Sequence, residues 1–205
     1  MTDTSSPVGT IATKLKGELG RRLVHASGAG LPILYLLGVP WDIVRVLFVI
    51  CAVGTMVLEF LRLTVGLDWF IYRHLTREYE QDSIAGYMQY MVSSAVVAVI
   101  FEPLIAIPAV LMLMLGDPIS GMLSSGELRK VKRPRSLAGM FLVCAVIAAP
   151  FLYETPLAIV LGALGGTIAD GVKPMIGDYI IDDNLTIAPL AAIAIWVGLE
   201  LTVLL

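Results

Sequence analysis

Residues 43–65 read IVRVLFVICAVGTMVLEFLRLTV, an apolar run whose charged members are Arg45, Glu59 and Arg62. A helix needs about 20 consecutive apolar residues to cross the hydrocarbon core of a bilayer, so this run predicts a transmembrane helix. Further apolar stretches cover residues 23–40, 83–101, 103–123, 136–153, 155–171 and 184–205. We therefore expect an all-α polytopic membrane bundle of about seven transmembrane helices. Residues 1–20 are expected to form a polar cytoplasmic segment, and residues 21–205 one membrane domain.

The composition also favours a membrane protein. Hydrophobic residues make up 58% of the 205 residues, charged residues make up 15%, and the mean hydropathy is +0.86. Soluble domains are about 45–50% apolar, so the surplus apolar surface is expected to face lipid. The formal net charge of −3 argues against a nucleic acid as partner.

The distribution of basic residues predicts the orientation of the helices. With a cytoplasmic N-terminus and an external C-terminus, thirteen of the 14 lysines and arginines lie on the cytoplasmic side, and Arg45 is the exception. This asymmetry is typical of multi-pass proteins of the cell membrane. The longer connecting segments, residues 66–82, 124–135 and 172–183, then lie inside, so the functional face is expected to be cytoplasmic. Residues 67–82 are expected to lie along the membrane interface.

Acidic groups near the inner ends of the spans are candidate functional groups, because a charge at membrane depth needs a partner, a wet cavity or a metal ion. Glu59 precedes Arg62 by three residues, which places both on one helix face as either a structural pair or a catalytic one. Asp117 lies in LGDPISG, where Pro118 is expected to break the helix and leave Asp117 capping a short helix that follows. A carboxylate beside exposed backbone donors suits a metal-bound phosphate.

A further acidic group surrounds Lys173 in the segments ADGVKP and GDYIIDDNLT. It comprises Asp170, Asp178, Asp182, Asp183 and Asn184. Either Asp183 or Asn184 is a plausible cap for the last helix. A run of oxygen ligands at the mouth of a span is also typical of a site for a hard cation such as Mg²⁺.

The segment SSGELRKVKRPRSLAG, residues 124–139, holds five basic residues within residues 129–135. Topological anchoring or attraction to anionic lipid explains such a loop as well as catalysis does. Its position shortly after Asp117 favours a role in binding nucleotide phosphates. The chain contains neither a P-loop nor a Rossmann fingerprint, so any nucleotide would be bound by loops.

Other features have simpler structural interpretations. Cys51 and Cys144 lie in apolar runs and are expected to be free thiols. Gly162 and Gly166 form a small-xxx-small pair that is typical of helix packing. His25 is more often a packing residue than a base in such a position, and it is kept as a candidate base.

Several short motifs occur in an order that resembles a known family: RRLVHASG, LEFLR, LTREYEQDSIAGYMQY, LGDPISGMLSSG, KRPRSLAG and DDNLTIAPLAA. This order resembles the CTP-dependent polyprenol kinases, which include dolichol kinase, phytol kinase and the yeast CTP-dependent diacylglycerol kinase. The closest likeness is to the compact archaeal dolichol kinases, and it extends from residue 21 to residue 192. The resemblance implies transfer of the γ-phosphate of CTP to the hydroxyl of an isoprenoid alcohol such as dolichol.

The resemblance also implies roles for individual residues. Asp117 matches the Gly-Asp motif of the family, and Asp183 with Asn184 matches its Asp-Asn pair, which implies that these three residues hold Mg²⁺. The implied nucleotide-binding residues are Lys132, Arg135, Ser136, Lys173, Gly116 and Gly121. Catalysis is expected of Asp117, with Glu59 or His25 as the base. Supporting roles are expected of Arg22, Arg62, Arg77 and Asp170.

The chain departs from the family pattern at four positions. Ala138 stands where many members have Glu, and Arg135 stands where they have Lys. Pro118 follows the Gly-Asp motif, and Asp170 replaces a usual Glu.

Two other functions are compatible with the same residues. A membrane cytidylyltransferase would use the same metal and CTP to make a CDP-lipid. A lipid or solute transporter also contains broken helices and intramembrane carboxylates. The concentration of polar groups at one membrane face favours an enzyme over a transporter.

Overall fold

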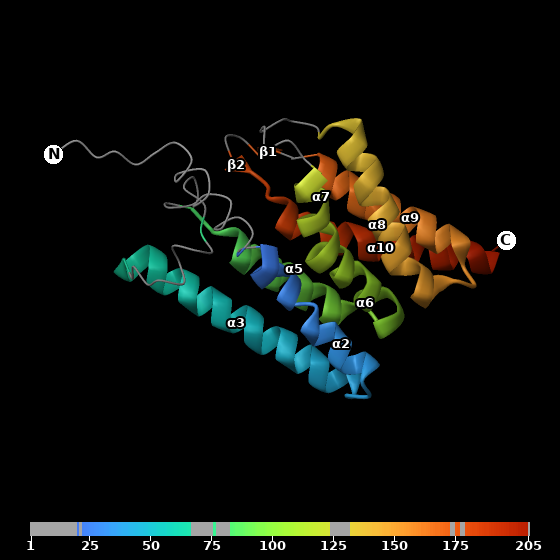
Figure 1. Cartoon of the computed structure of the whole chain (residues 1–205). Helices are drawn as coiled ribbons and strands as arrows, with labels where there is room; N and C mark the ends of the chain where they lie inside the picture. The colour runs from blue at the N-terminus through green and yellow to red at the C-terminus, as the bar shows by residue number, and fades with distance from the viewer. Residues whose placement is uncertain are drawn as a thin grey trace.

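The computed structural model describes residues 20, 22–66, 76, 83–123, 132–172, 175–176 and 179–204. Most of these residues are helical (Figure 1). Residues 22–27 are helical and lead through a turn into α2 (Gly30–Leu36). The longer elements are α3 (Trp41–Val65), α5 (Gly86–Ile100), α6 (Pro103–Leu111), a π-helical turn η2 (Met112–Gly116), α7 (Asp117–Leu123), α8 (Pro134–Leu152), α9 (Pro156–Gly171) and α10 (Asp183–Leu204). Between α9 and α10, β1 (Met175–Ile176) and β2 (Tyr179–Ile180) pair antiparallel, with Met175 opposite Ile180.

Four helical segments within the described residues are long and apolar enough to cross a membrane. They are Trp41–Val65, Pro103–Leu123, Pro134–Leu152 and Asp183–Leu204. Gly86–Ile100 and Pro156–Gly171 are shorter apolar helices. The prediction of a helical fold with several apolar helices long enough to cross a membrane is therefore confirmed for the described residues. The count of seven spans and the orientation of the two termini stay predictions.

The helix pair α9–α10 packs with its backbones in direct contact because glycines line the interface. A Cβ atom at Gly165 would lie 2.8 Å from the carbonyl oxygen of Leu190, and one at Gly198 would lie 2.5 Å from the Cα of Ala158. The next residue, Gly166, lies close to the thiol of Cys144 on α8 as well as to Ala191 on α10. Small residues allow this close approach, and it fixes how the ends of α9 and α10 lie relative to each other.

The segment α6–η2–α7 passes through the centre of the bundle. Ile107, Met112, Leu113 and Met114 are each at most 1% exposed. By contrast, α3 lies along one edge and packs against α5 and α2 (Figure 1). The middle of this segment is thus surrounded by the other helices, whereas Met122 and Leu123 at its end are exposed.

The predicted helix break at Pro118 is wrong. Asp117 keeps helical backbone angles (φ −60°, ψ −48°), and α7 continues directly from the π-helical turn. Pro118 has no N–H for the carbonyl of Met114, and its ring crowds that carbonyl. A wider π turn accommodates both effects while the chain remains helical, and such turns are frequent at functional sites.

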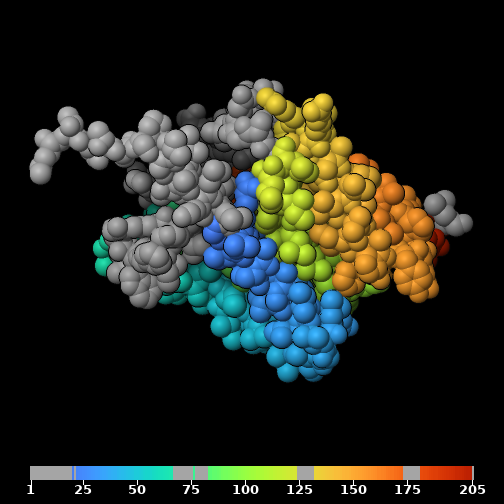
Figure 2. All heavy atoms as spheres, viewed as in Figure 1, coloured from blue at the N-terminus to red at the C-terminus, as the bar shows by residue number. Residues whose placement is uncertain are grey.

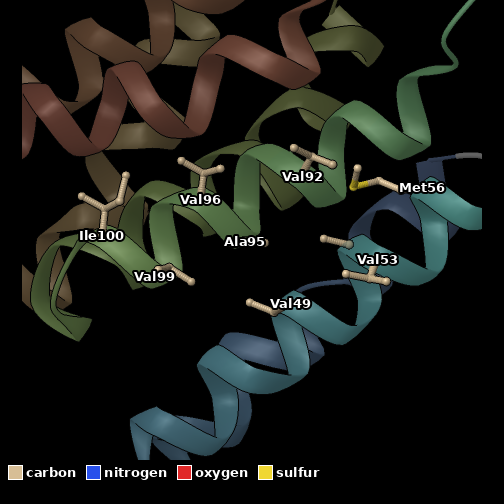
Figure 3. A pocket seen from close by; sticks show the side chains of 9 residues that line it. Val49, Val53, Met56, Val92, Ala95, Val96, Val99 and Ile100 are labelled. Atoms are coloured by element: carbon tan, nitrogen blue, oxygen red, sulfur yellow. The ribbon is translucent and has the colours of Figure 1, made fainter.

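An apolar groove of about 320 Å³ lies between α3 and α5 (Figure 3). Val49, Val53 and Met56 line one wall, and Val92 and Val96 belong to the other. Its lining side chains are all apolar, so the groove offers no group for proton transfer or ion binding. The chemistry of the protein must therefore be sought elsewhere.

A buried ion pair within α3 is hydrogen-bonded to the start of α5. The guanidinium of Arg62 donates to both carboxylate oxygens of Glu59, at 2.9 and 2.8 Å. The hydroxyl of Tyr87 and, at 2.7 Å, the backbone N–H of Ala85 also donate to Glu59. With 3% of its surface exposed, Glu59 depends on these donors to remain charged away from water.

We predict that Glu59→Gln lowers the free energy of unfolding in detergent by about 3 kcal/mol, because it leaves the Arg62 guanidinium buried without its charge partner. Asp42→Asn is the matched control. The carboxylate of Asp42 also pairs with an arginine three residues later, Arg45, but its side chain is 90% exposed. The control should lose less than about 1 kcal/mol. Equal losses in the two variants would refute a structural role for the Glu59 pair.

Candidate functional site

Three carboxylates from three helices meet at one end of the bundle. Asp117 begins α7, Asp170 lies one residue before the end of α9, and Asp183 begins α10. One oxygen from each carboxylate can be chosen so that all three lie within 4.8 Å of one another. The side chains of Asp117, Asp170 and Asp183 are 20%, 0% and 7% exposed. We call these three residues the acidic cluster.

The packing of the helices explains this convergence. Because α9 and α10 pack against each other along their lengths, the end of α9 and the start of α10 lie together beside the short β1–β2 hairpin (Figure 1). The chain from α6 delivers Asp117 to the same end. The structure thus brings together Asp117 and Asp183, which the sequence analysis assigned to a metal. It adds Asp170, to which that analysis gave a supporting role.

Lys132 lies within the acidic cluster. Its ammonium nitrogen is 2.6 Å from Oδ1 of Asp170 and 3.7 Å from Oδ2 of Asp183. Its backbone N–H donates to the carbonyl of Gly171 at 3.1 Å, which fixes the position from which the side chain extends. Burial disfavours the ammonium, but the charges of Asp170 and Asp183 outweigh burial and raise the pKa of Lys132 above its usual value. Lys132 is therefore a cation throughout the physiological pH range.

Ser120 fixes the remaining oxygen of Asp170. Its hydroxyl donates to Oδ2 of Asp170 at 2.7 Å, and Ser120 has no exposed surface. The sequence analysis missed this residue. Its signal was present in LGDPISG, because Ser120 follows Asp117 by three residues and so lies on the same helix face.

His25 reaches the acidic cluster from the first described helical segment. Its Nε2 lies 2.8 Å from Oδ1 of Asn184 and 3.9 Å from Oδ2 of Asp117. The hydroxyl of Tyr90 donates to the His25 carbonyl at 2.8 Å, and a Cβ at Gly28 would collide with that hydroxyl. Tyr90, which the sequence analysis did not select, therefore helps to hold His25 beside the cluster.

The orientation of the Asn184 amide determines whether Nε2 of His25 donates or accepts in their hydrogen bond. Its Nδ2 donates to Oδ1 of Asp182 at 2.6 Å, so its Oδ1 is the atom that faces His25. In this arrangement Nε2 of His25 is a donor, and His25 orients Asn184. The backbone N–H of Asn184 also donates to Asp182 at 3.0 Å. The cap of α10 is therefore Asp182, and neither residue that the sequence analysis considered supplies it.

Arg22 braces α7 next to the acidic cluster. Its guanidinium donates to the carbonyls of Pro118, at 3.4 Å, and of Gly121, at 3.0 Å. A Cβ at Gly121 would lie 3.3 Å from this guanidinium, so a glycine permits the contact. Figure 2 shows the corresponding arrangement, with the first described residues in blue against the yellow-green central segment and α8 beyond it. Gly116 instead packs against Met140 on α8.

Some of the other candidate residues lie at the same end of the bundle as the acidic cluster, and others lie away from it. The hydroxyl of Ser136 donates to the carbonyl of Leu123 at 3.4 Å and ties α8 to α7, whereas Arg135 is exposed. Glu59 and Arg62 form a separate ion pair within α3, and the N–H of Ala85 before α5 donates to Glu59. Arg77, Lys173 and Asp178 lie outside the described residues, as does most of the predicted interfacial segment 67–82.

The donor set of the acidic cluster fits a hard divalent cation. All of its ligand atoms are carboxylate oxygens, and their mutual separations allow one ion to contact all three residues. Mg²⁺ prefers such oxygen ligands and is commonly held by one or two carboxylates together with substrate phosphates. The arrangement is therefore a candidate site for a divalent cation.

We predict that Ser120→Ala lowers the free energy of unfolding by about 1–2 kcal/mol, because a buried carboxylate oxygen of Asp170 loses its donor. The control is Ser27→Ala, which removes an exposed hydroxyl bonded to the nearby carbonyl of Val24. This control should change stability by less than about 0.5 kcal/mol. Thermal or denaturant unfolding in detergent measures both values. A Ser120 variant as stable as the Ser27 variant would contradict the positioning role.

Comparisons with known protein families, with curated proteins and with solved structures found no match to this chain.

Proposed function

We propose that this protein transfers the γ-phosphate of CTP to the hydroxyl of a membrane isoprenoid alcohol and releases CDP. The observation that carries the proposal is the convergence of Asp117, Asp170 and Asp183 around Lys132. Carboxylates that hold a metal and a cation that neutralises phosphate are the two components that phosphoryl transfer requires. The order of motifs that resembles the polyprenol kinases supplies the substrate class.

Each component of the proposed site has a defined role. Asp117, Asp170 and Asp183 would hold Mg²⁺, and Asn184, oriented by His25, would complete the oxygen-rich surroundings. Bound Mg²⁺ would supply neutralisation of the charge on the triphosphate. Lys132 and the exposed Arg135 bind phosphate oxygens, and Ser120 keeps Asp170 aligned. Ser136 and the glycines at 116 and 121 shape the helix ends that carry these groups.

Three residues are candidates for the general base that accepts the alcohol proton. Glu59 is occupied by Arg62, Tyr87 and Ala85 in its own cluster. His25 lies beside the acidic cluster, but its Nε2 donates to Asn184. Asp117 is the most exposed carboxylate of the three, and its Oδ2 lies 3.9 Å from Nε2 of His25. We assign acceptance of the alcohol proton to Asp117, because a loose transition state needs only a weak base.

The location of the proposed site suits the two substrates. An isoprenoid alcohol dissolves in the bilayer with its hydroxyl near the headgroups, while CTP is a cytosolic anion. The acidic cluster lies at helix ends, and it contacts Lys132, which belongs to the basic stretch 129–135 of the sequence. The positive-inside rule places that stretch in the cytoplasm, with seven spans, an internal N-terminus and an external C-terminus.

We predict that purified protein with Mg²⁺ and γ-labelled CTP yields a lipid-soluble label when an isoprenoid alcohol is supplied. Asp117→Asn and Asp183→Asn should each reduce the rate by at least about 100-fold, since each removes a charged ligand. Asp42→Asn, the same change at an exposed aspartate near the start of α3, should retain activity. Undiminished activity in the Asp117 variant would exclude this site assignment.

The position of the label separates the competing functions. CTP labelled in its cytidine should leave no label in the lipid if the protein is a kinase. Cytidine incorporated into lipid would instead identify a cytidylyltransferase. Solute or lipid movement in liposomes without turnover of CTP would identify a transporter.

We predict the orientation from cysteine labelling in intact cells. In a chain without Cys51 and Cys144, Glu154→Cys should react with a membrane-impermeant maleimide, because the loop between α8 and α9 lies outside. Arg133→Cys, at the other end of α8, should react only after the membrane is permeabilised. Both positions are exposed in the structure, so a difference reports sidedness. The reverse pattern would contradict a cytoplasmic site.

A further inference from the structure

The ammonium of Lys132 lies where a cation bound by the acidic cluster would lie. It is 2.6 Å from Oδ1 of Asp170 and 3.7 Å from Oδ2 of Asp183, and the charge of Asp117 also raises its pKa. These are the same three carboxylates whose oxygens can surround one ion. Mg²⁺ binds oxygen at about 2.0–2.1 Å, which brings it within the space that this ammonium fills.

One observation shows why the acidic cluster needs a cation from the chain itself, and a second shows how Lys132 is held beside it. Asp170 has no exposed surface, so its carboxylate would be strongly destabilised without a nearby positive charge. The backbone N–H of Lys132 donates to the carbonyl of Gly171, the residue after Asp170. This hydrogen bond keeps the backbone of Lys132 next to the acidic cluster. The four-carbon side chain remains flexible, and its ammonium can move while its backbone stays fixed.

We propose that Lys132 is a tethered counter-ion that occupies the cation position of the acidic cluster and is displaced when a divalent metal ion binds. The proposal rests on the proposed function in taking the cluster as the metal site. Once displaced, the ammonium is repelled by the metal ion and attracted by the nearest anion. In the proposed reaction that anion is the phosphate of the nucleotide that accompanies the metal. One residue thereby stabilises the empty cluster and then contacts the substrate.

The proposal predicts that loss of a basic residue beside the metal site changes the affinity for the metal ion itself. Lys132→Gln should bind a divalent cation more tightly than the unchanged protein, because the competing ammonium is gone. Charged hydrogen bonds of this kind correspond to a gain of about tenfold or more in affinity. A lysine that acts only on phosphate would leave metal affinity unchanged in the absence of nucleotide.

The experiment measures Mn²⁺ binding to purified protein without nucleotide, from the EPR signal of the free ion. Lys132→Gln should lower the dissociation constant about tenfold, and Mg²⁺ should compete for the same site. Arg133→Gln removes one positive charge from the adjacent residue and should leave the dissociation constant nearly unchanged. Equal or weaker binding by the Lys132 variant would overturn the proposal.

A second measurement uses the unchanged protein and does not depend on the folding of a variant. An amine-acylating reagent should modify Lys132 several-fold faster at saturating Mg²⁺ than at equal ionic strength without it. The modification rates of the other lysines, measured by peptide mass spectrometry, correct for any effect of Mg²⁺ on the reactivity of the reagent. An unchanged or slower rate would overturn the displacement. Neither measurement uses CTP or an alcohol, so a failure of the kinase assignment would leave these results intact, and their failure would leave the transfer assay interpretable.

Discussion

The structure depends on neutralising one carboxylate that has no contact with water. Asp170 is held at Oδ1 by the ammonium of Lys132 and at Oδ2 by the hydroxyl of Ser120. These partners come from the segment before α8 and from α7, while Asp170 itself belongs to α9. A charge at this depth is stable only with such partners, so satisfying Asp170 requires these three parts of the chain to meet. Their meeting creates the acidic cluster.

Glu59, a buried carboxylate outside the acidic cluster, shows what distinguishes this cluster from a structural ion pair. Among the described residues, Glu59 has one arginine as its charge partner and receives two further hydrogen bonds, so its partners lie within α3 and at the start of α5. In the acidic cluster one ammonium instead lies among carboxylates from three helices. A group of oxygens arranged in this way can accept a divalent cation, whereas no such group surrounds Glu59 within the described part of the chain.

The sequence predicted local features well because apolar length and charge act locally. Apolar runs predicted the positions of the helices, and Gly162 and Gly166 predicted close packing of α9. The acidic residues Asp117 and Asp183 were also selected from local patterns. The break at Pro118 was wrong because the chain can widen into a π turn and remain helical, an outcome that the proline alone does not determine. Ser120 and Tyr90 were missed because their importance depends on partners 50 and 65 residues away.

The central claim is that Asp117, Asp170 and Asp183 jointly hold one divalent cation. Crystals of the protein grown with Mn²⁺ test it directly through the anomalous scattering of the metal. We expect one strong anomalous peak at bonding distance from oxygens of all three carboxylates. The ammonium of Lys132 should then lie farther from Asp170 than it does here. A saturating concentration of Mn²⁺ that leaves no peak there, with Lys132 still bound to Asp170, would contradict the account.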